Sequence, residues 1–222
     1  MNKINSQDST NYLEILLDNI MLEGNLDVPN IAKGIVVFAH GSGSSRFSPR
    51  NRFVAEKLQS YGLATLLLDL LTREEEQIDL RTREYRFNIN LLSERLTKAT
   101  HWLQKNKKTK QLDIGYFGSS TGAAAALIAA SKNPKIIKAV VSRGGRTDLA
   151  ENYVSLVSAP TLLIVGSFDT FVLQINQETI KKMKTENRLE IISGASHLFE
   201  EPGKLEIVAE LAASWFEKHL NS

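Results

Sequence analysis

A serine between two glycines is the part of this sequence best suited to covalent chemistry. The segment reads Gly118-Ser-Ser-Thr-Gly122, a G-x-S-x-G pattern that follows an apolar run and precedes four alanines, 123–126. Between a strand and a helix, this pattern is typical of a nucleophile elbow, a strained turn that raises the serine hydroxyl above the sheet. Only small residues fit beside such a turn, which explains the two glycines. We predict that Ser120 is a nucleophile.

A serine hydroxyl attacks a carbonyl efficiently only when a base takes its proton. The sequence has four histidines. His40 precedes the elbow and is expected to support the following loop, His101 falls within a predicted helix, and His219 lies near a helix end. His197 follows the elbow, in a loop of small residues directly after an apolar run. We therefore predict His197 as the base.

The base in turn needs a carboxylate that fixes its tautomer, and two aspartates are candidates. Asp169 ends the run Gly166-Ser-Phe-Asp, one strand before His197. Asp148 lies one strand earlier, and either residue could instead cap a helix. We prefer Asp169, because the chain leaves its strand abruptly there and places the side chain at the strand tip.

Two backbone N–H groups are expected to bind the negatively charged oxygen formed during such a reaction. One belongs to Thr121, which directly follows the nucleophile. The other is expected from the loop 40–45, where Ser42 is the best candidate because Gly41 and Gly43 let the backbone turn inward. The same loop lacks the Lys-Ser/Thr ending of a phosphate-binding P-loop.

The rest of the chain has the pattern needed to position these residues. Apolar runs alternate with amphipathic segments, which predicts an α/β protein with a doubly wound, mostly parallel sheet and helices on both faces. Sites in such sheets lie at the carboxyl ends of the strands, where every residue discussed above is expected. Segments 12–18 and 20–27 are predicted antiparallel edge strands, 35–39, 63–68, 112–117, 137–142, 160–165 and 189–192 inner or later strands, and 53–61, 91–104, 173–183 and 205–220 helices.

The pattern also predicts the domain organisation. Residues 1–10 are expected to be a flexible tail, and 11–222 a single domain with no inserted cap domain. Residues 72–88 interrupt the alternation with a dense run of charges. They are interpreted either as a solvated loop containing a short helix or as a flap over the site.

Composition excludes several other classes of protein. The formal net charge is +2, which gives no nucleic-acid footprint, and cysteine is absent, which excludes disulfides and thiolate sites. No apolar signal segment or membrane span is apparent. We predict a cytoplasmic protein, a monomer or homodimer, that acts on a small-molecule acyl substrate. No cofactor, metal, nucleic acid or membrane is expected to take part.

Taken together, these segments resemble the dienelactone hydrolase-like family of the α/β-hydrolase superfamily over about residues 12–220. The resemblance implies the α/β-hydrolase fold. The enzyme for which the family is named uses a cysteine nucleophile, whereas the matching residue here is Ser120. With serine at this position, the resemblance therefore implies a serine esterase, or a related acyl hydrolase, acting on a small ester or lactone. The resemblance rests on 40–51, Gly118–Gly122, Ser142-Arg-Gly-Gly-Arg146, Gly166–Asp169 and Ser196-His197.

Clues to the substrate are few. Arginines in the loops at the strand ends could hold a substrate carboxylate, although ion pairs with Asp69, Asp148 or the segment 72–88 are an equal alternative. Apolar side chains in the same loops could line an acyl pocket. The candidate substrate contacts are Arg46, Arg143, Phe168 and Leu198.

Two other functions stay open at this point. An acyltransferase would use the same three residues and differ only in the group that accepts the acyl unit. A non-catalytic module would keep the fold to bind a ligand or partner, although binding alone requires neither the Ser, Asp and His set nor an oxyanion loop.

Overall fold

The computed structural model describes residues 11–220. The predicted tail, 1–10, lies outside the described residues. The strands are β1 (Tyr12–Leu17), β2 (Ile20–Asp27), β3 (Ile35–Ala39), β4 (Ala64–Leu68), β5 (Ile114–Ser119), β6 (Ile137–Arg143), β7 (Thr161–Gly166) and β8 (Asn187–Ile192). The helices are α1 (Pro49–Ser60), α2 (Arg73–Thr82), α3 (Ile89–Lys105), α4 (Thr121–Lys132), α5 (Glu151–Val154), α6 (Thr170–Lys182) and α7 (Lys204–His219).

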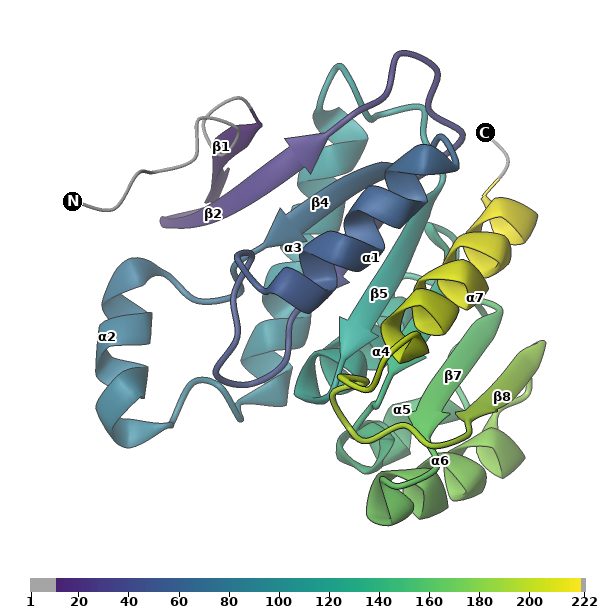
Figure 1. Ribbon diagram of the computed structural model, residues 1–222. Helices are drawn as coiled ribbons and strands as arrows, with labels where there is room; N and C mark the ends of the chain where they lie inside the picture. The colour runs from purple at the N-terminus through teal and green to yellow at the C-terminus, as the bar shows by residue number, and fades with distance from the viewer. Residues whose placement is uncertain (1–10, 221–222) are drawn as a thin grey trace.

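These strands form one sheet in the order β1-β2-β4-β3-β5-β6-β7-β8. The β1–β2 and β2–β4 pairs are antiparallel, and all pairs from β4 to β8 are parallel. Figure 1 shows α1 and α7 on one face of the sheet and α3 and α4 on the other. The doubly wound α/β prediction is confirmed, and no cap domain is inserted among residues 11–220.

Successive side chains of the inner strands point to opposite faces of the sheet and pack into two separate apolar cores. On β3, Ile35 and Val37 face the core beneath α3 and α4, while Val36 and Phe38 face the core beneath α1 and α7. Since both faces are covered, every residue of β3, β4, β5 and β7 is buried. This double burial explains why these strands read as continuous apolar runs.

Several predicted boundaries differ from the structure. Helix α1 begins at Pro49 rather than at 53, because the Ser48 hydroxyl caps it by accepting from the Asn51 N–H, and proline suits the first helical position. Strand β2 lies between β1 and β4, so only β1 of the predicted edge pair is an edge. Helix α6 begins at Thr170, earlier than predicted.

The charged segment 72–88 contains helix α2, so the prediction of a short helix there is confirmed. Thr72 and Glu75 form a capping box, in which the Thr72 hydroxyl accepts from the Glu75 N–H and the Glu75 carboxylate accepts from the Thr72 N–H. Arg95 on α3 pairs with Glu75 and holds α2 against the domain.

Among the described residues, no helix combines the length and apolar character that crossing a bilayer requires.

Candidate active site

Ser120 lies at the junction of β5 and α4 in a conformation that few residues other than glycine adopt. Its φ is 51° and its ψ is −119°. A Cβ at Gly118 would lie 2.4 Å from the Cα of Ala123, and a Cβ at Gly122 would lie 2.1 Å from the carbonyl oxygen of Ala39. The two glycines therefore let α4 pack against β5 and β3 directly behind the serine, as an elbow requires.

His197 and Asp169 come together from two neighbouring strand ends. Asp169 follows β7, His197 follows β8, and His197 Nδ1 lies 2.5 Å from Asp169 Oδ2. Asp169 occupies the N-cap position of α6, yet its side chain makes no capping bond, so the carboxylate is left to His197. Since a carboxylate only accepts, the bridging proton sits on Nδ1, and Nε2 is left as the basic atom of the ring.

The rival residues are engaged elsewhere. Asp148 pairs with Arg146 at 2.8 Å, which helps to hold the pKa of Asp148 below its usual range. The Nε2 atom of His40 accepts from the Leu70 N–H at 3.2 Å, so His40 supports the start of its loop, as expected. The His219 ring lies 4.7 Å from the Trp215 ring on α7, and burial lowers the pKa of His219.

The two expected oxyanion donors lie side by side, but with an unexpected contact. The Ser42 N–H donates to the Thr121 side-chain oxygen at 2.9 Å. Thr121 is the first residue of α4, so its own backbone N–H has no carbonyl partner within the helix and lies at the positive end of the helix dipole. A substrate oxygen that uses both donors must therefore replace the Thr121 hydroxyl as the acceptor for Ser42.

Ser120 and His197 open into one cavity of about 510 Å³. Its walls come from the loop 40–45, called the oxyanion loop below, the start of α1, the ends of β5 and β6, and the loop after β8. Leu198 and Arg143, two of the predicted substrate contacts, line it. The lining residues are Gly41–Ser45, Phe47–Arg50, Ser119, Ser120, Arg143, His197 and Leu198.

Arg143 is the most unusual charge in this cavity. The residue is 7% exposed, and its Nη1 atom is buried without a hydrogen-bond partner. Burial, together with the nearby Arg50 charge, lowers the pKa of Arg143 to about 10. Even so, the guanidinium stays protonated at neutral pH.

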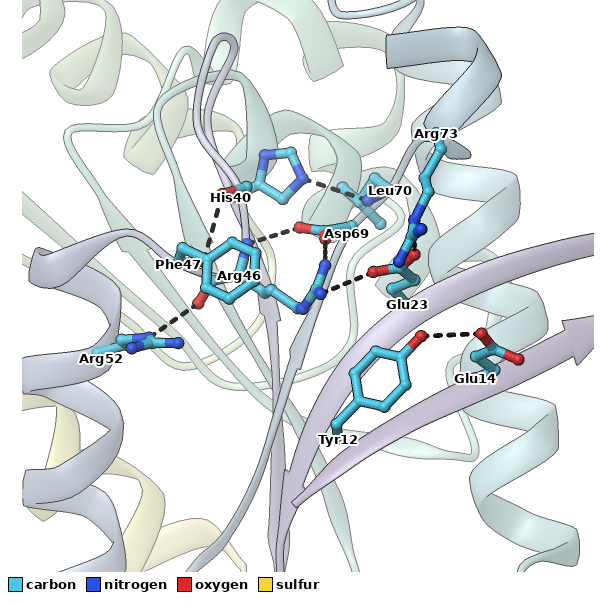
Figure 2. A network of polar contacts seen from close by, with 11 residues as sticks. Tyr12, Glu14, Glu23, His40, Arg46, Phe47, Arg52, Asp69, Leu70 and Arg73 are labelled. Atoms are coloured by element: carbon cyan, nitrogen blue, oxygen red, sulfur yellow. Dashed lines mark hydrogen bonds and ion pairs between the residues drawn. The ribbon is translucent and has the colours of Figure 1, made fainter. Parts of the chain in front are cut away.

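Arg46 is placed differently, in the ion pair with Asp69 that was the alternative to a substrate contact. Its guanidinium pairs with Asp69, which follows β4, and with Glu23 on β2. Figure 2 shows this network, in which Arg73 also reaches Glu23. The Arg46 backbone N–H donates to Asp69 as well, at 2.6 Å. Arg46 therefore anchors the loop that carries Ser42 rather than facing the Ser120 cavity.

Phe168 is not among the residues that line the cavity, and the residue is 69% exposed. Arg50, which the sequence analysis did not single out, does line it, at the second position of α1. A buried bond that no motif in the sequence indicates joins Ser119 to α1: the Ser119 hydroxyl donates to Asn51 Oδ1 at 3.1 Å. This bond ties the residue before the nucleophile to α1.

The segment 72–88 lies beside the oxyanion loop rather than over Ser120. Glu76, Asp79 and Arg86 share a second cavity, of about 210 Å³, with residues 40–45. None of the residues that line the Ser120 cavity comes from this segment. This placement favours a segment packed against the side of the oxyanion loop over a flap that covers Ser120.

Within residues 11–220, no cluster of three or more His, Asp or Glu side chains is arranged to hold a metal ion.

This geometry can be compared with known proteins. The profile of the Dienelactone hydrolase family matches residues 22–221, nearly the whole chain. The chain belongs to the dienelactone hydrolase family. A solved dienelactone hydrolase from Anabaena variabilis is 57% identical, covers 95% of this chain and 97% of its own, and superposes with a TM-score of 0.94.

Other relatives extend the comparison. The solved structure of Est1E from Butyrivibrio proteoclasticus shares the fold at 18% identity, with a TM-score of 0.80 over 94% of this chain and 98% of its own. Two curated Mycobacterium tuberculosis proteins, each named Putative phosphoribosyl transferase, are 52% identical over 208 residues. That match covers 94% of this chain but 46% of those proteins. The chain thus spans about half the length of the curated relatives it matches.

Proposed function

We propose that this chain is a serine-dependent carboxylic ester hydrolase that acts on a small ester or lactone. The observation that carries the proposal is the His197–Asp169 pair, whose histidine lines the same cavity as a serine held at φ 51°. Membership of the dienelactone hydrolase family supports a hydrolase of this kind. A binding module would need neither the strained serine nor the oriented histidine.

In the first half of the reaction, Ser120 Oγ attacks the acyl carbonyl carbon as Nε2 of His197 takes the hydroxyl proton. The carbonyl oxygen becomes an oxyanion held by the N–H groups of Thr121 and Ser42. Collapse breaks the bond between the acyl carbon and the leaving oxygen, which receives the proton from His197. Asp169 stays ionised and stabilises the imidazolium.

In the second half, water replaces the leaving group. His197 removes a proton from water as the water oxygen attacks the acyl carbon, and the bond to Ser120 Oγ then breaks while Oγ regains its proton. The product is a carboxylic acid, and the enzyme returns to its starting state. For a lactone, the released alcohol and acid belong to one molecule.

The small size of the substrate follows from the cavity. About 510 Å³ is within the usual range for small-ligand sites. Phe47 and Leu198 are the large apolar residues of its lining, which otherwise includes several serines and two arginines. We therefore expect short acyl chains to be preferred over long ones.

The test is fluorophosphonate labelling of the purified protein, followed by turnover of a panel of acyl esters. We expect stoichiometric labelling at Ser120, and a loss of turnover of about 10⁴-fold or more in both Ser120→Ala and His197→Ala. The matched controls are Ser131→Ala and His101→Ala, which change a serine and a histidine on helices α4 and α3 away from the cavity. Both controls should keep full activity.

Each outcome separates the candidate functions. Undiminished turnover in Ser120→Ala would defeat the assignment of the nucleophile. A folded protein that neither labels nor turns over any ester would favour the binding module. If added alcohols or amines capture the acyl group in preference to water, the same residues would serve an acyltransferase. The name of the M. tuberculosis relatives adds no further candidate, because the match covers about half of those proteins and does not assign the transfer activity to that half.

A further inference from the structure

Both backbone groups of Ser120 are bound by the loop 143–146, which follows β6. The Ser120 N–H donates to the Arg143 carbonyl oxygen at 3.1 Å, and the Ser120 carbonyl oxygen accepts from the Arg146 N–H at 3.0 Å. The same oxygen also accepts from the Ala123 N–H within α4. Since the backbone conformation of Ser120 is strained, it persists only where surrounding contacts hold it. The loop 143–146 therefore helps to fix the proposed nucleophile.

The same loop packs closely beside the imidazole of His197. Gly144 has a φ of 54°, and its N–H donates to the Ile164 carbonyl oxygen on β7 at 2.8 Å. A Cβ at Gly144 would lie 3.2 Å from Cε1 and 3.3 Å from Nδ1 of His197. Nδ1 is the atom that pairs with Asp169. One short loop thus contacts both the proposed nucleophile and the proposed base.

A buried amide on α6 holds this loop in place. Asn176 is fully buried, and its Nδ2 donates to the carbonyl oxygens of Gly145 and Val172, at 2.8 Å in both cases. Because both partners are acceptors, the NH₂ side of the amide must face them. The bond to Val172 stays within α6, whereas the bond to Gly145 joins α6 to the loop. Helix α6 also begins directly after Asp169, the partner of His197.

The other side of this amide is left without compensation. The Oδ1 atom of Asn176 is buried and has no hydrogen-bond partner among the described residues. A buried acceptor without a partner costs free energy, and an apolar side chain of similar shape avoids that cost. Asn176 therefore serves stability poorly. What it does supply, and leucine would not, is the donor to Gly145.

We infer that Asn176 is a positioning residue, which fixes Ser120 and His197 relative to each other through the loop 143–146. The effect on turnover rests on the proposed hydrolase function, but the bonds of the loop can be tested without turnover. A misplacement of about 1 Å between reacting groups lowers a rate by about 100-fold. A small movement of this loop is therefore expected to slow the chemical step while leaving substrate binding unchanged.

The kinetic test uses Asn176→Leu, because leucine has nearly the size and branching of asparagine but no amide. We expect kcat for a short acyl ester to fall about tenfold or more, with KM changed less than about twofold. The rate constant for fluorophosphonate labelling of Ser120 should fall by a similar factor. The matched control is Thr179→Val, about one turn further along α6, which removes a buried bond of 2.6 Å between the Thr147 and Thr179 hydroxyls. This control should keep both kcat and KM.

Hydrogen exchange supplies the measurement that needs no turnover. The Ser120 and Arg146 amide protons make the two bonds between the elbow and the loop, so both should exchange slowly in the wild type. In Asn176→Leu, both should exchange about tenfold faster or more relative to amides in the central strand β3. In Thr179→Val, their exchange relative to β3 should be unchanged. The comparison with β3 separates a loosened loop from a general loss of stability.

A purely structural role for Asn176 gives different results. In that case Asn176→Leu would lower the Tm more than Thr179→Val does, with kcat and the relative exchange of both amides unchanged. That result, in a protein whose wild type hydrolyses esters, would overturn the inference and keep the hydrolase. If Asn176→Leu does not fold, Asn176→Ala must show the same loss of kcat and the same faster exchange for the inference to stand. If the wild type turns over no ester, faster exchange in Asn176→Leu would defeat the hydrolase and keep the positioning of Ser120 by Asn176.

Discussion

The contact between Ser42 and Thr121 shows how one side chain can compete with a substrate. Thr121 was expected to contribute only its backbone N–H, yet its hydroxyl oxygen accepts the Ser42 N–H in the structure. A hydrogen bond of this kind contributes about 1 kcal/mol net. The hydrogen bond from the Ser42 N–H to the oxyanion must be stronger than this bond before Ser42 can stabilise the oxyanion in the proposed reaction.

Thr121→Val tests this competition, because valine keeps the shape and removes the hydroxyl. We expect kcat/KM for a short neutral ester to rise about two- to fivefold, since the Ser42 N–H is then free for the oxyanion. Thr170→Val, an exposed substitution at the start of α6, is the control and should change nothing. A fall of tenfold or more in Thr121→Val would instead mean that the hydroxyl itself donates to the oxyanion.

Residue types alone could not separate the arginines of the site. Both lie in loops after strand-like runs: Arg46 follows the glycine- and serine-rich segment 40–45, and Arg143 precedes two glycines. On sequence alone, both are candidate substrate contacts. What separates them is the antiparallel pairing of β2 with β4, which brings Glu23 beside Asp69 and gives Arg46 two carboxylates. That pairing is a long-range property of the sheet, whereas the prediction of Ser120, Asp169 and His197 needs only their order in the chain and their places after strands.

At the scale of elements, α2 illustrates a signal that was present but not used. The spacing Thr72-x-x-Glu75 predicts a capping box and hence a helix start, and the structure has both. The position of α2 against residues 40–45, by contrast, depends on contacts that no local pattern encodes.

Asp79 holds the end of α2 in place, and its chemistry predicts a pH dependence. Its Oδ1 accepts from the backbone N–H groups of Tyr85 and Arg86 at 2.8 and 3.0 Å, and its Oδ2 pairs with the Arg86 side chain. Burial alone would raise the pKa of Asp79, but these bonds and the Arg86 charge outweigh it and lower the pKa. The resulting stabilisation is present above the ordinary aspartate pKa of about 4 and is lost as the pH falls further.

Asp79→Asn should therefore destabilise the protein at pH 7 by about 3 kcal/mol, since it leaves Arg86 without its charge partner. Denaturant unfolding would measure this change. The variant should also lose less stability than the wild type between about pH 5 and pH 3, because the group that titrates is gone. Glu84→Gln, an exposed change in the same turn, is the control. Parallel pH profiles for the wild type and Asp79→Asn would contradict this role.

At the scale of the whole molecule, the fold was predictable because its inner strands are covered on both faces. That burial produces apolar runs, and their alternation with helices indicates a parallel, doubly wound sheet. Strand ends then converge at one edge, which is why residues as distant in sequence as Ser42, Ser120 and His197 line one cavity. The size of that cavity and its unpaired charge depend on side-chain packing and could not be derived from the runs.

The same architecture predicts how the protein meets its substrate. Among residues 11–220, the Ser120 cavity is walled only by loops at strand ends, the start of α1 and the ends of β5 and β6, and α2 lies to the side. Nothing in this arrangement has to open before an ester enters.

Enzymes with a lid over the site accelerate abruptly when the substrate forms a separate phase, because the interface stabilises the open lid. Here we expect the rate on tributyrin to saturate smoothly through its solubility limit, as it does for a fully dissolved short ester. A lid-bearing lipase measured in parallel should show the jump. A severalfold jump for this protein at the same concentration would mean that α2, or another segment, covers Ser120 in solution.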